Sequence, residues 1–136
     1  MKNKISYLVI LFLMFLLIGC DGLKSEHITE RYYLVAVDSA EEMTLSYSVD
    51  NDNSTVGVVS KTVFSVGYND EYIIVKQHPL NNRKIINYFI VPIYKSINYS
   101  PEKGVIGPLS LKQFEENRKD LNISNILFTI EIEDLK

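Results

Sequence analysis

The sequence lacks several features that would point to a particular class of protein. It has a single cysteine and no tryptophan, and it contains neither an internal repeat nor a low-complexity tract. One cysteine cannot form a disulfide within the chain, so a hydrophobic core must stabilise the fold. The Lys and Arg residues do not cluster into the basic patch that a nucleic-acid-binding domain would carry. We therefore expect no nucleic-acid partner.

Only one long apolar run is present, and it lies at the N-terminus. Lys2 and Lys4 precede an uncharged stretch of 14 residues, 5–18. A bilayer-spanning helix needs about 20 apolar residues, whereas a secretory signal peptide has a shorter core after a positive start. Residues 1–19 are therefore predicted to be a signal peptide. The alternative is an uncleaved anchor.

The end of this run resembles a lipobox, the processing signal of bacterial lipoproteins. Leu17, Ile18, Gly19 and Cys20 match its pattern of a branched apolar residue, a tolerant position, a small residue and cysteine. The resemblance implies cleavage between Gly19 and Cys20 and attachment of lipid, including acyl chains such as palmitate, to Cys20. Two or three chains would satisfy the need for more than one anchoring signal. We expect an exported chain, anchored to a membrane of the cell envelope. The alternative is a plain secretory signal in which Cys20 is an ordinary residue.

The rest of the chain has the length of one domain. Residues 20–30 are predicted to be the lipidated cysteine and a polar tether, and residues 31–136 a single domain. Without Lys2 and Lys4, 12 basic residues stand against 17 acidic ones. This mild negative charge favours solubility.

Strand patterns dominate the domain. The segment 43–49 alternates apolar and polar residues, as in a strand with one buried face, and a turn at Asn69 and Asp70 marks the clearest hairpin. The run 55–68 is expected to bend near Ser60 and Lys61. The strands are expected at 31–38, 43–49, 55–68, 71–77, 85–94 and 127–133.

One helix is predicted in the C-terminal half of the domain. Ser110 is a good N-cap, and Gln113 completes a capping box. Glu115 and Lys119 are spaced for an ion pair on the exposed face. The expected buried stripe consists of Leu111, Phe114 and Leu121. The predicted fold class is α+β, mainly β: an antiparallel curved sheet with this helix packed on it.

Residues suited to metal binding are few. His27 and His78 are expected to be solvent-exposed or capping residues, because a zinc site needs three or four convergent ligands. The acidic turn that begins at Asp50 has Thr55 and Lys61 where a calcium loop needs Gly and Glu. We predict no metal and no cofactor.

Catalytic motifs are also missing. The sequence has neither a Gly-x-Ser-x-Gly elbow nor a Gly-rich phosphate loop. The acidic pairs Glu41–Glu42 and Glu115–Glu116 are expected to face solvent. Tyrosine is in excess, which suits either a recognition surface or strand interiors. The tyrosines of the domain are Tyr32, Tyr33, Tyr47, Tyr68, Tyr72, Tyr88, Tyr94 and Tyr99. We predict that the protein is not an enzyme.

Part of the sequence resembles a group of small bacterial lipoproteins of unknown function. The shared motifs are a hairpin ending in YIIVKQ at 72–77, a YFI strand at 88–90, and GPLS at 107–110 before a helix with Phe114. The resemblance implies a fold and carries no activity. Separately, Asp38-Ser39-Ala40 resembles a short O-glycosylation acceptor motif of Bacteroidetes-type envelopes, although an Asp-Ser turn explains it equally well.

These observations lead to two functional hypotheses. The first is a membrane-anchored envelope lipoprotein whose domain is a non-enzymatic binding or accessory module for an envelope protein or ligand. The alternative is an envelope enzyme, or an inhibitor of one, with a site built from the loops 50–54, 78–84 and 98–108. A cleft that joins these loops and is lined with buried ionisable groups would favour the alternative.

Overall fold

Successive strands in the first part of the domain pair with one another to form a four-stranded antiparallel sheet, in the order β1-β2-β3-β4. Leu45 and Tyr47 are fully buried, and Thr44 and Ser48 on the other face are half-buried, as the alternation predicts, but Ser46 on that second face is buried as well. The computed structural model describes residues 24–50 and 54–136. The strands of this sheet are β1 (Lys24–Thr29), β2 (Tyr32–Ala36), β3 (Thr44–Ser48) and β4 (Thr55–Val59).

The following strands form a five-stranded antiparallel sheet, in the order β8-β7-β6-β5-β9. The predicted hairpin at Asn69 is confirmed, since its side-chain oxygen accepts hydrogen bonds from the backbone amides of Glu71 and Tyr72, both at 2.8 Å. The strands are β5 (Val63–Tyr68), β6 (Tyr72–Gln77), β7 (Asn87–Pro92), β8 (Ile106–Leu109) and β9 (Ile130–Glu131).

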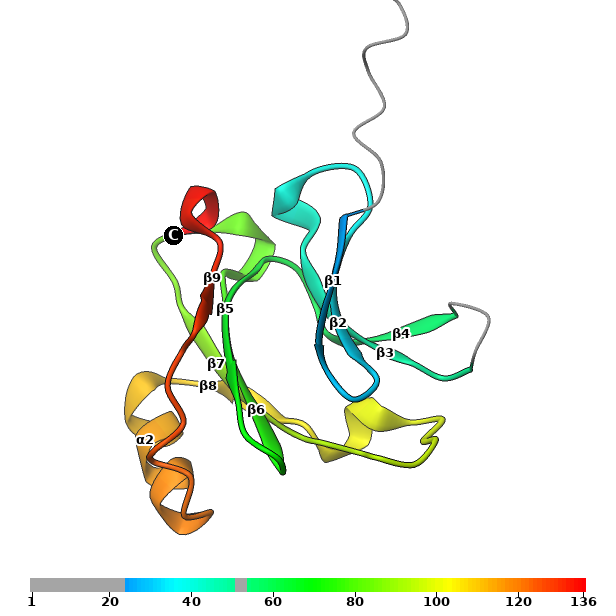
Figure 1. Cartoon of the computed structure of the whole chain (residues 1–136). Coiled ribbons are helices and arrows are strands. Elements are labelled where there is room, and N and C mark those ends of the chain that lie inside the picture. Colours follow the sequence, from blue (N-terminus) through cyan, green and yellow to red (C-terminus); the bar gives the residue numbers. More distant parts are fainter. Residues whose placement is uncertain (1–23, 51–53) are drawn as a thin grey trace, which may run out of the picture.

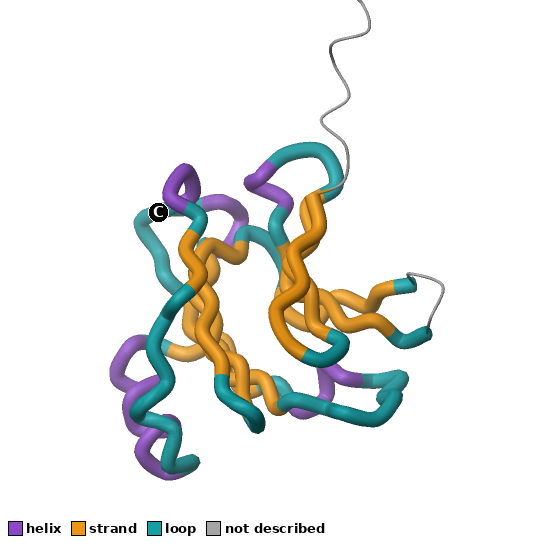
Figure 2. The backbone as a smooth tube through the Cα atoms, in the orientation of Figure 1, coloured by secondary structure: helices purple, strands orange, loops and turns teal. Residues whose placement is uncertain are grey.

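The two sheets stand beside each other, and the helix α2 (Leu111–Asp120) covers the far face of the five-stranded sheet (Figures 1 and 2). The predicted class, α+β and mainly β, is confirmed, but the strands form two sheets where the sequence suggested one curved sheet. One core lies between the sheets and includes Tyr32, Leu45 and Val75. A second core lies under the helix and includes Ile74 and Phe114.

The helix begins as predicted. The Ser110 hydroxyl accepts from the Gln113 amide at 3.3 Å, and the Gln113 side chain accepts from the Ser110 amide at 2.9 Å. Phe114 is buried and stacks on Tyr88, with ring centroids 4.8 Å apart. The expected burial of Leu111 is wrong, because this residue is 56% exposed. No helix in the described part of the chain is long and apolar enough to cross a membrane.

The ion pair expected between Glu115 and Lys119 is not formed; Glu115 pairs instead with Arg118, at 3.0 Å. Arg118 is buried, and its guanidinium also donates to the carbonyls of Ser124 at 2.7 Å and Ile126 at 2.6 Å. These carbonyls lie in the loop after the helix and need a donor once they are removed from water. Arg118 therefore fastens this loop to the helix, a role that residue spacing did not indicate.

The predicted tether is wrong for residues 24–29, which form the edge strand β1. This strand pairs along its length with β2, from Lys24 opposite Ala36 to Thr29 opposite Tyr32. Only Ile28 is buried in it. An edge strand with a single buried side chain lacks the apolar pattern by which strands are recognised. The described domain therefore extends to Lys24 instead of beginning at residue 31.

The long run 55–68 bends where expected, and the bend carries the chain from one sheet to the other. After β4, Ser60 and Lys61 make the turn, the Lys61–Thr62 peptide is cis, and the Val63 amide then donates to the Met43 carbonyl at 2.8 Å. Other strands are shorter than predicted. The strand expected at 127–133 has a ladder of only two residues, although its alternation holds, since Phe128 and Ile130 are half-buried and Thr129 is exposed.

Candidate functional site

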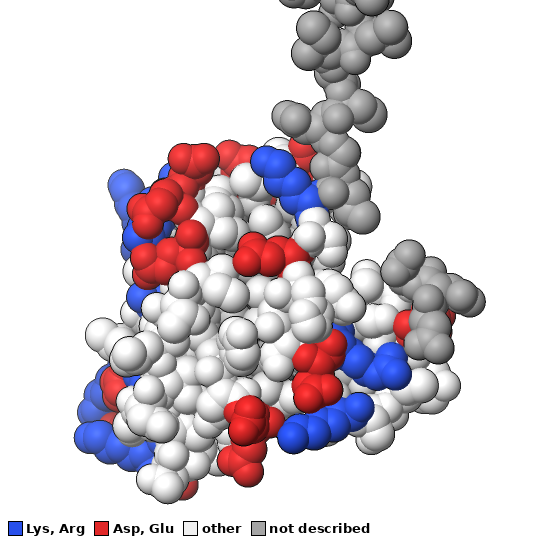
Figure 3. All heavy atoms as spheres, viewed as in Figure 1, with Lys and Arg blue, Asp and Glu red and all other residues white. Residues whose placement is uncertain are grey.

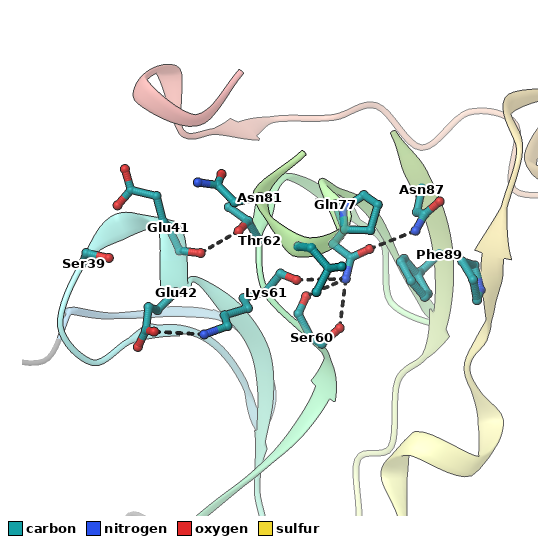
Figure 4. Close-up of a pocket in the computed structure, with 13 residues that line it drawn as sticks. Ser39, Glu41, Glu42, Ser60, Lys61, Thr62, Gln77, Asn81, Asn87 and Phe89 are labelled. Carbon is teal, nitrogen blue, oxygen red and sulfur yellow. Dashed lines mark hydrogen bonds and ion pairs between the residues drawn. The ribbon is translucent and has the colours of Figure 1, made fainter. Parts of the chain in front are cut away.

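A pocket of about 780 Å³ opens where the two sheets meet (Figure 4), at the end of the molecule where β1 begins (Figure 1). We call it the junction pocket. One wall is the 3-10 turn η1 (Ala40–Glu42) with Ser39, and the floor is the β4–β5 bend at Ser60–Thr62. The other walls are the turn η2 (Pro79–Asn81) and the side chains of Gln77, Asn87, Phe89 and Pro108.

Gln77 holds the floor of the pocket in place. Its buried side-chain amide donates to the Ser60 carbonyl at 3.0 Å, the Ser60 hydroxyl at 2.9 Å and the Lys61 carbonyl at 3.1 Å. Asn87 donates to the Gln77 oxygen at 3.2 Å, and Thr62 exchanges backbone hydrogen bonds with His78. Because buried polar groups need such partners, this network is structural and keeps the bend rigid.

The ionisable groups of the pocket lie at its mouth and are exposed. Lys61 and Glu42 form an ion pair at 2.9 Å, with side chains 57% and 37% exposed. The backbone amide of Glu41 itself, then the Ser39 hydroxyl and the charge of Arg83, lower the pKa of the Glu41 carboxyl. A general acid at neutral pH needs a raised pKa, so Glu41 is suited to binding a cation or a hydrogen-bond donor.

The opposite wall is apolar. Phe89 forms it together with Pro108 and Pro79, and Leu80 stands at the rim with 97% of its side chain exposed. Gly107 has a φ of 144°, and a Cβ there would lie 2.4 Å from the Phe89 ring, so only glycine allows the chain to pass this close. The pocket thus combines amide groups, an apolar wall and exposed charges of both signs, which suits it to binding a ligand with polar and apolar parts.

The two histidines differ in their exposure to solvent. His27 is exposed as expected, and its ring nitrogen Nε2 lies 2.8 Å from the Glu30 carbonyl. His78 is not exposed but is buried and stacked on Phe64 with centroids 4.1 Å apart, and it stands at the N-cap position of η2 without a capping hydrogen bond from its side chain. Its Nδ1 lies 2.8 Å from the Ile85 carbonyl, while Nε2 has no hydrogen-bond partner among the described residues. Through its contact with the Ile85 carbonyl, the buried His78 ring holds the loop after β6 in place.

No group of three His, Cys, Asp or Glu residues comes together within residues 24–50 and 54–136. The acidic turn falls partly outside these residues, because Asp52 lies in the gap. The Asp50 carboxylate accepts from the Ser54 amide, four residues further on, at 3.2 Å. Gly19 and Cys20, the predicted cleavage and lipidation residues, also lie outside the described residues.

Several tyrosines have structural roles. The Tyr32 hydroxyl donates to the Pro92 carbonyl at 2.8 Å, and the Tyr47 hydroxyl donates to the Ser96 carbonyl at 2.9 Å. Both side chains are fully buried in the four-stranded sheet and reach the end of β7 and the loop that follows it. They join the two sheets at the end opposite the junction pocket. Tyr68 and Tyr99 are exposed, and none of the tyrosines in the described residues lines the pocket.

The sequence located some parts of this pocket and missed others. The bend at Ser60 and the loop 78–84 were both singled out, and the pocket includes residues 79–81 and, from the loop 98–108, Pro108. Glu41 and Glu42 are in a turn, as expected, but line the pocket. Gln77 and Phe89 were missed, because in sequence they are ordinary strand residues. Ser39, part of the possible glycosylation motif, is an exposed residue at the mouth.

Fold and pocket together define a small two-sheet β domain with a helix on one outer face and a pocket at the sheet junction. The chain belongs to the family described as "Protein of unknown function (DUF3997)", whose model matches residues 29–135. The expectation of membership in an uncharacterised family is thereby confirmed. No curated protein and no solved structure was found to match the chain.

Proposed function

We propose that the chain is an envelope lipoprotein, held to a membrane by lipid on Cys20, whose domain binds a partner or ligand in the junction pocket without catalysis. Support for the anchor comes from the complete lipobox at residues 17–20 and from an apolar run too short to span a bilayer. The observation that carries the binding role is the pocket of about 780 Å³, with a rigid floor and exposed charges.

Three features of the pocket favour binding over catalysis. Its buried amide, on Gln77, already donates to Ser60 and Lys61 and so is occupied in holding the floor. Its charged groups are exposed, whereas a catalytic acid or base usually has a pKa shifted by burial and neighbours. The pKa of Glu41 is lowered, so this carboxylate remains ionised at neutral pH. A cationic or hydrogen-bond-donating group of a ligand would meet Glu41, and apolar parts would meet Phe89 and Pro108.

The anchor is tested by Cys20→Ser in the producing cell, with metabolic labelling by a palmitate analogue. The variant should take up no label and should accumulate as unprocessed precursor, because the substitution removes the thiol that receives the lipid. Wild-type protein should be labelled and shorter by the 19 residues of the signal. Equal labelling of the two proteins would refute the anchor.

The binding role is tested by comparative capture of partners from the native membrane. Glu41→Arg places a bulky positive side chain at the mouth of the pocket, and Glu116→Arg makes the same charge change on the exposed face of the helix. Species that bind in the pocket should be recovered with wild type and with Glu116→Arg, and lost with Glu41→Arg. Recovery of the same species in equal amounts with all three proteins would place the binding surface elsewhere.

A further inference from the structure

The loop that connects β6 to β7 has an unusual surface composition for a connection between two strands. Leu80 is 97% exposed, Ile85 is 47% exposed and Ile86 is 41% exposed. Between them Arg83 and Lys84 are exposed as well. We call residues 79–86 the β6–β7 loop. Apolar side chains flanking basic ones are typical of protein segments that contact the interfacial region of a bilayer.

The base of the β6–β7 loop is held in place by contacts within the domain, whereas its tip is exposed to solvent. The buried ring of His78 hydrogen-bonds the Ile85 carbonyl at 2.8 Å and stacks on Phe64, and the Asn82 amide closes the tip by donating to the Pro79 carbonyl at 2.9 Å. Leu80 has a φ of 52°, a left-handed conformation that a leucine rarely adopts. The side chain gains no burial within the domain from this conformation. Such strain is common where a residue is held for contact with a partner.

The position of the anchor decides which end of the domain faces the membrane. Lys24 begins β1 and is four residues from Cys20, so the two lie at most about 14 Å apart even in a fully extended chain. A domain of this size is about 30–35 Å across. The end that carries the start of β1 must therefore stay next to the bilayer, and the opposite end is held away from it.

The β6–β7 loop is at this same end. Strand pairing connects the start of β1 to the end of β6. Lys24 lies opposite Ala36 at the end of β2, and the Met43 carbonyl before β3 accepts from the Val63 amide at the start of β5. Val63 in turn lies opposite Gln77, the last residue of β6. Figure 1 shows the start of β1, the C-terminus and the turn that follows β6 together at one end.

Charge at this end does not prevent contact with anionic lipid. Acidic and basic side chains both gather there (Figure 3). Lys61 pairs with Glu42, and Lys136 pairs with Glu131 and Glu133, so two lysines offset part of the acidic charge locally. Arg83 and Lys84 are exposed and form no ion pair within 4.0 Å among the described residues, although the charge of Arg83 also acts on the Glu41 carboxyl.

From these observations we propose that the β6–β7 loop docks onto the surface of the membrane that carries the lipid anchor. Leu80 enters the interfacial region, and Arg83 and Lys84 contact anionic headgroups. The proposal rests on lipidation of Cys20, the proposed function above. Docking would fix the orientation of the domain and place the rim of the junction pocket at the membrane surface, so that the pocket receives a ligand presented there.

The test uses the full lipidated protein, reconstituted in vesicles of phosphatidylcholine with or without phosphatidylglycerol. Cys20 is the only cysteine and is occupied by lipid, so Leu80→Cys provides a single thiol for an environment-sensitive fluorophore. Tyr99→Cys is the matched control, since Tyr99 is 78% exposed and lies in the loop after β7, at the opposite end. The mass of the N-terminal peptide establishes in each sample that the lipid is present.

A label at position 80 should show a blue-shifted emission, quenching by spin-labelled lipid and protection from iodide. A label at position 99 should show no blue shift, no quenching by spin-labelled lipid and full quenching by iodide. Adding Arg83→Gln and Lys84→Gln should weaken the lipid quenching at position 80 on phosphatidylglycerol vesicles. Equal iodide quenching at both positions in lipidated protein would overturn the docking proposal alone. Protection of position 80 from both quenchers would overturn it in favour of a protein contact. Absence of lipid on Cys20 would instead refute the proposed function.

Discussion

The two sheets differ in how many of their faces are covered. The five-stranded sheet is buried on both sides: Ile73 and Val75 of β6 face the other sheet, whereas Ile74 faces the helix, and all three are fully buried. The four-stranded sheet is buried on one side only, so Leu34 of β2 is buried while Val35 next to it is half-buried. Both sheets are antiparallel, so their environment and not their pairing sets this difference.

This comparison explains the two kinds of strand pattern in the sequence. A strand covered on one face alternates apolar and polar residues, as β3 does, and a strand covered on both faces has apolar residues at successive positions, as β6 does at residues 73–75. The continuous pattern therefore identifies the central layer of the domain. The five-stranded sheet is the central layer because the helix covers its outer face. Weakening the packing between the helix and this sheet is therefore the most direct way to test the difference in coverage between the two sheets.

The largest effect is expected from Phe114→Ala. Phe114 is 1% exposed and contacts the rings of Tyr88 and Phe128, so truncation would open a cavity between the helix and the sheet. Removing a buried Phe typically costs about 3–5 kcal/mol, a large share of the roughly 5–15 kcal/mol that stabilises a domain. Urea unfolding should show a clearly lower midpoint for this variant than for the wild type.

Glu116→Ala on the exposed face of the same helix is the matched control. It should change the free energy of unfolding by about 0.5 kcal/mol or less, because an exposed side chain has few contacts to lose. Unfolding of Phe114→Ala at the wild-type midpoint would mean that the helix does not cover the sheet, and the two sheets would then be alike.

An intermediate effect is expected from Tyr32→Phe, which cuts a connection between the sheets. The hydroxyl of Tyr32 donates to the Pro92 carbonyl at 2.8 Å and accepts from the Tyr94 amide at 3.3 Å. Leaving these partly buried backbone groups without a partner costs up to about 1–3 kcal/mol. The free energy of unfolding at pH 7 should fall by this amount, whereas Tyr99→Phe, at an exposed tyrosine, should leave it unchanged.

The same substitution should change the response to alkali. Burial raises the pKa of Tyr32 from 10.0 to about 12 in the folded protein. Since the unfolded chain ionises first, the stabilisation is complete below pH 10 and is lost as pH rises from 10 to 12. Tyr32→Phe lacks this group, so its stability should fall less steeply than that of the wild type across this window. Parallel curves would show that Tyr32 ionises equally in both states.

The smallest effect is expected on the uncovered face of the four-stranded sheet. Val35→Thr keeps a β-branched side chain in β2 and should change the free energy of unfolding by about 0.5 kcal/mol or less. Ile74→Thr makes a similar change on the helix-covered face of β6, where it would place a hydroxyl in an apolar core, and should cost at least about 1–3 kcal/mol. Equal unfolding midpoints for the two variants would contradict the conclusion that only the five-stranded sheet is covered on both faces.

Local sequence patterns predicted the turns and the helix start of the domain better than they predicted which distant residues come into contact. The capping box at Ser110, the turn at Asn69 and the bend at Ser60 were all found, because each depends on residues a few positions apart. Edge strand β1 was missed, because its single buried residue leaves no periodicity. Arg118 was missed because its partners, the carbonyls of Ser124 and Ile126, lie in a loop whose path depends on packing.

The sequence by itself determined most of the strands, the helix, the burial of Phe114 and the prediction of a lipid anchor at Cys20, since all of these depend on short-range spacing. Only the tertiary structure decided that the strands divide into two sheets, and that Glu41, Lys61 and Phe89 line one pocket. The physical reason is that periodicity states which face of a strand is buried but not what covers it. Contacts between residues far apart in the chain arise when the sheets pack, and no local pattern encodes them.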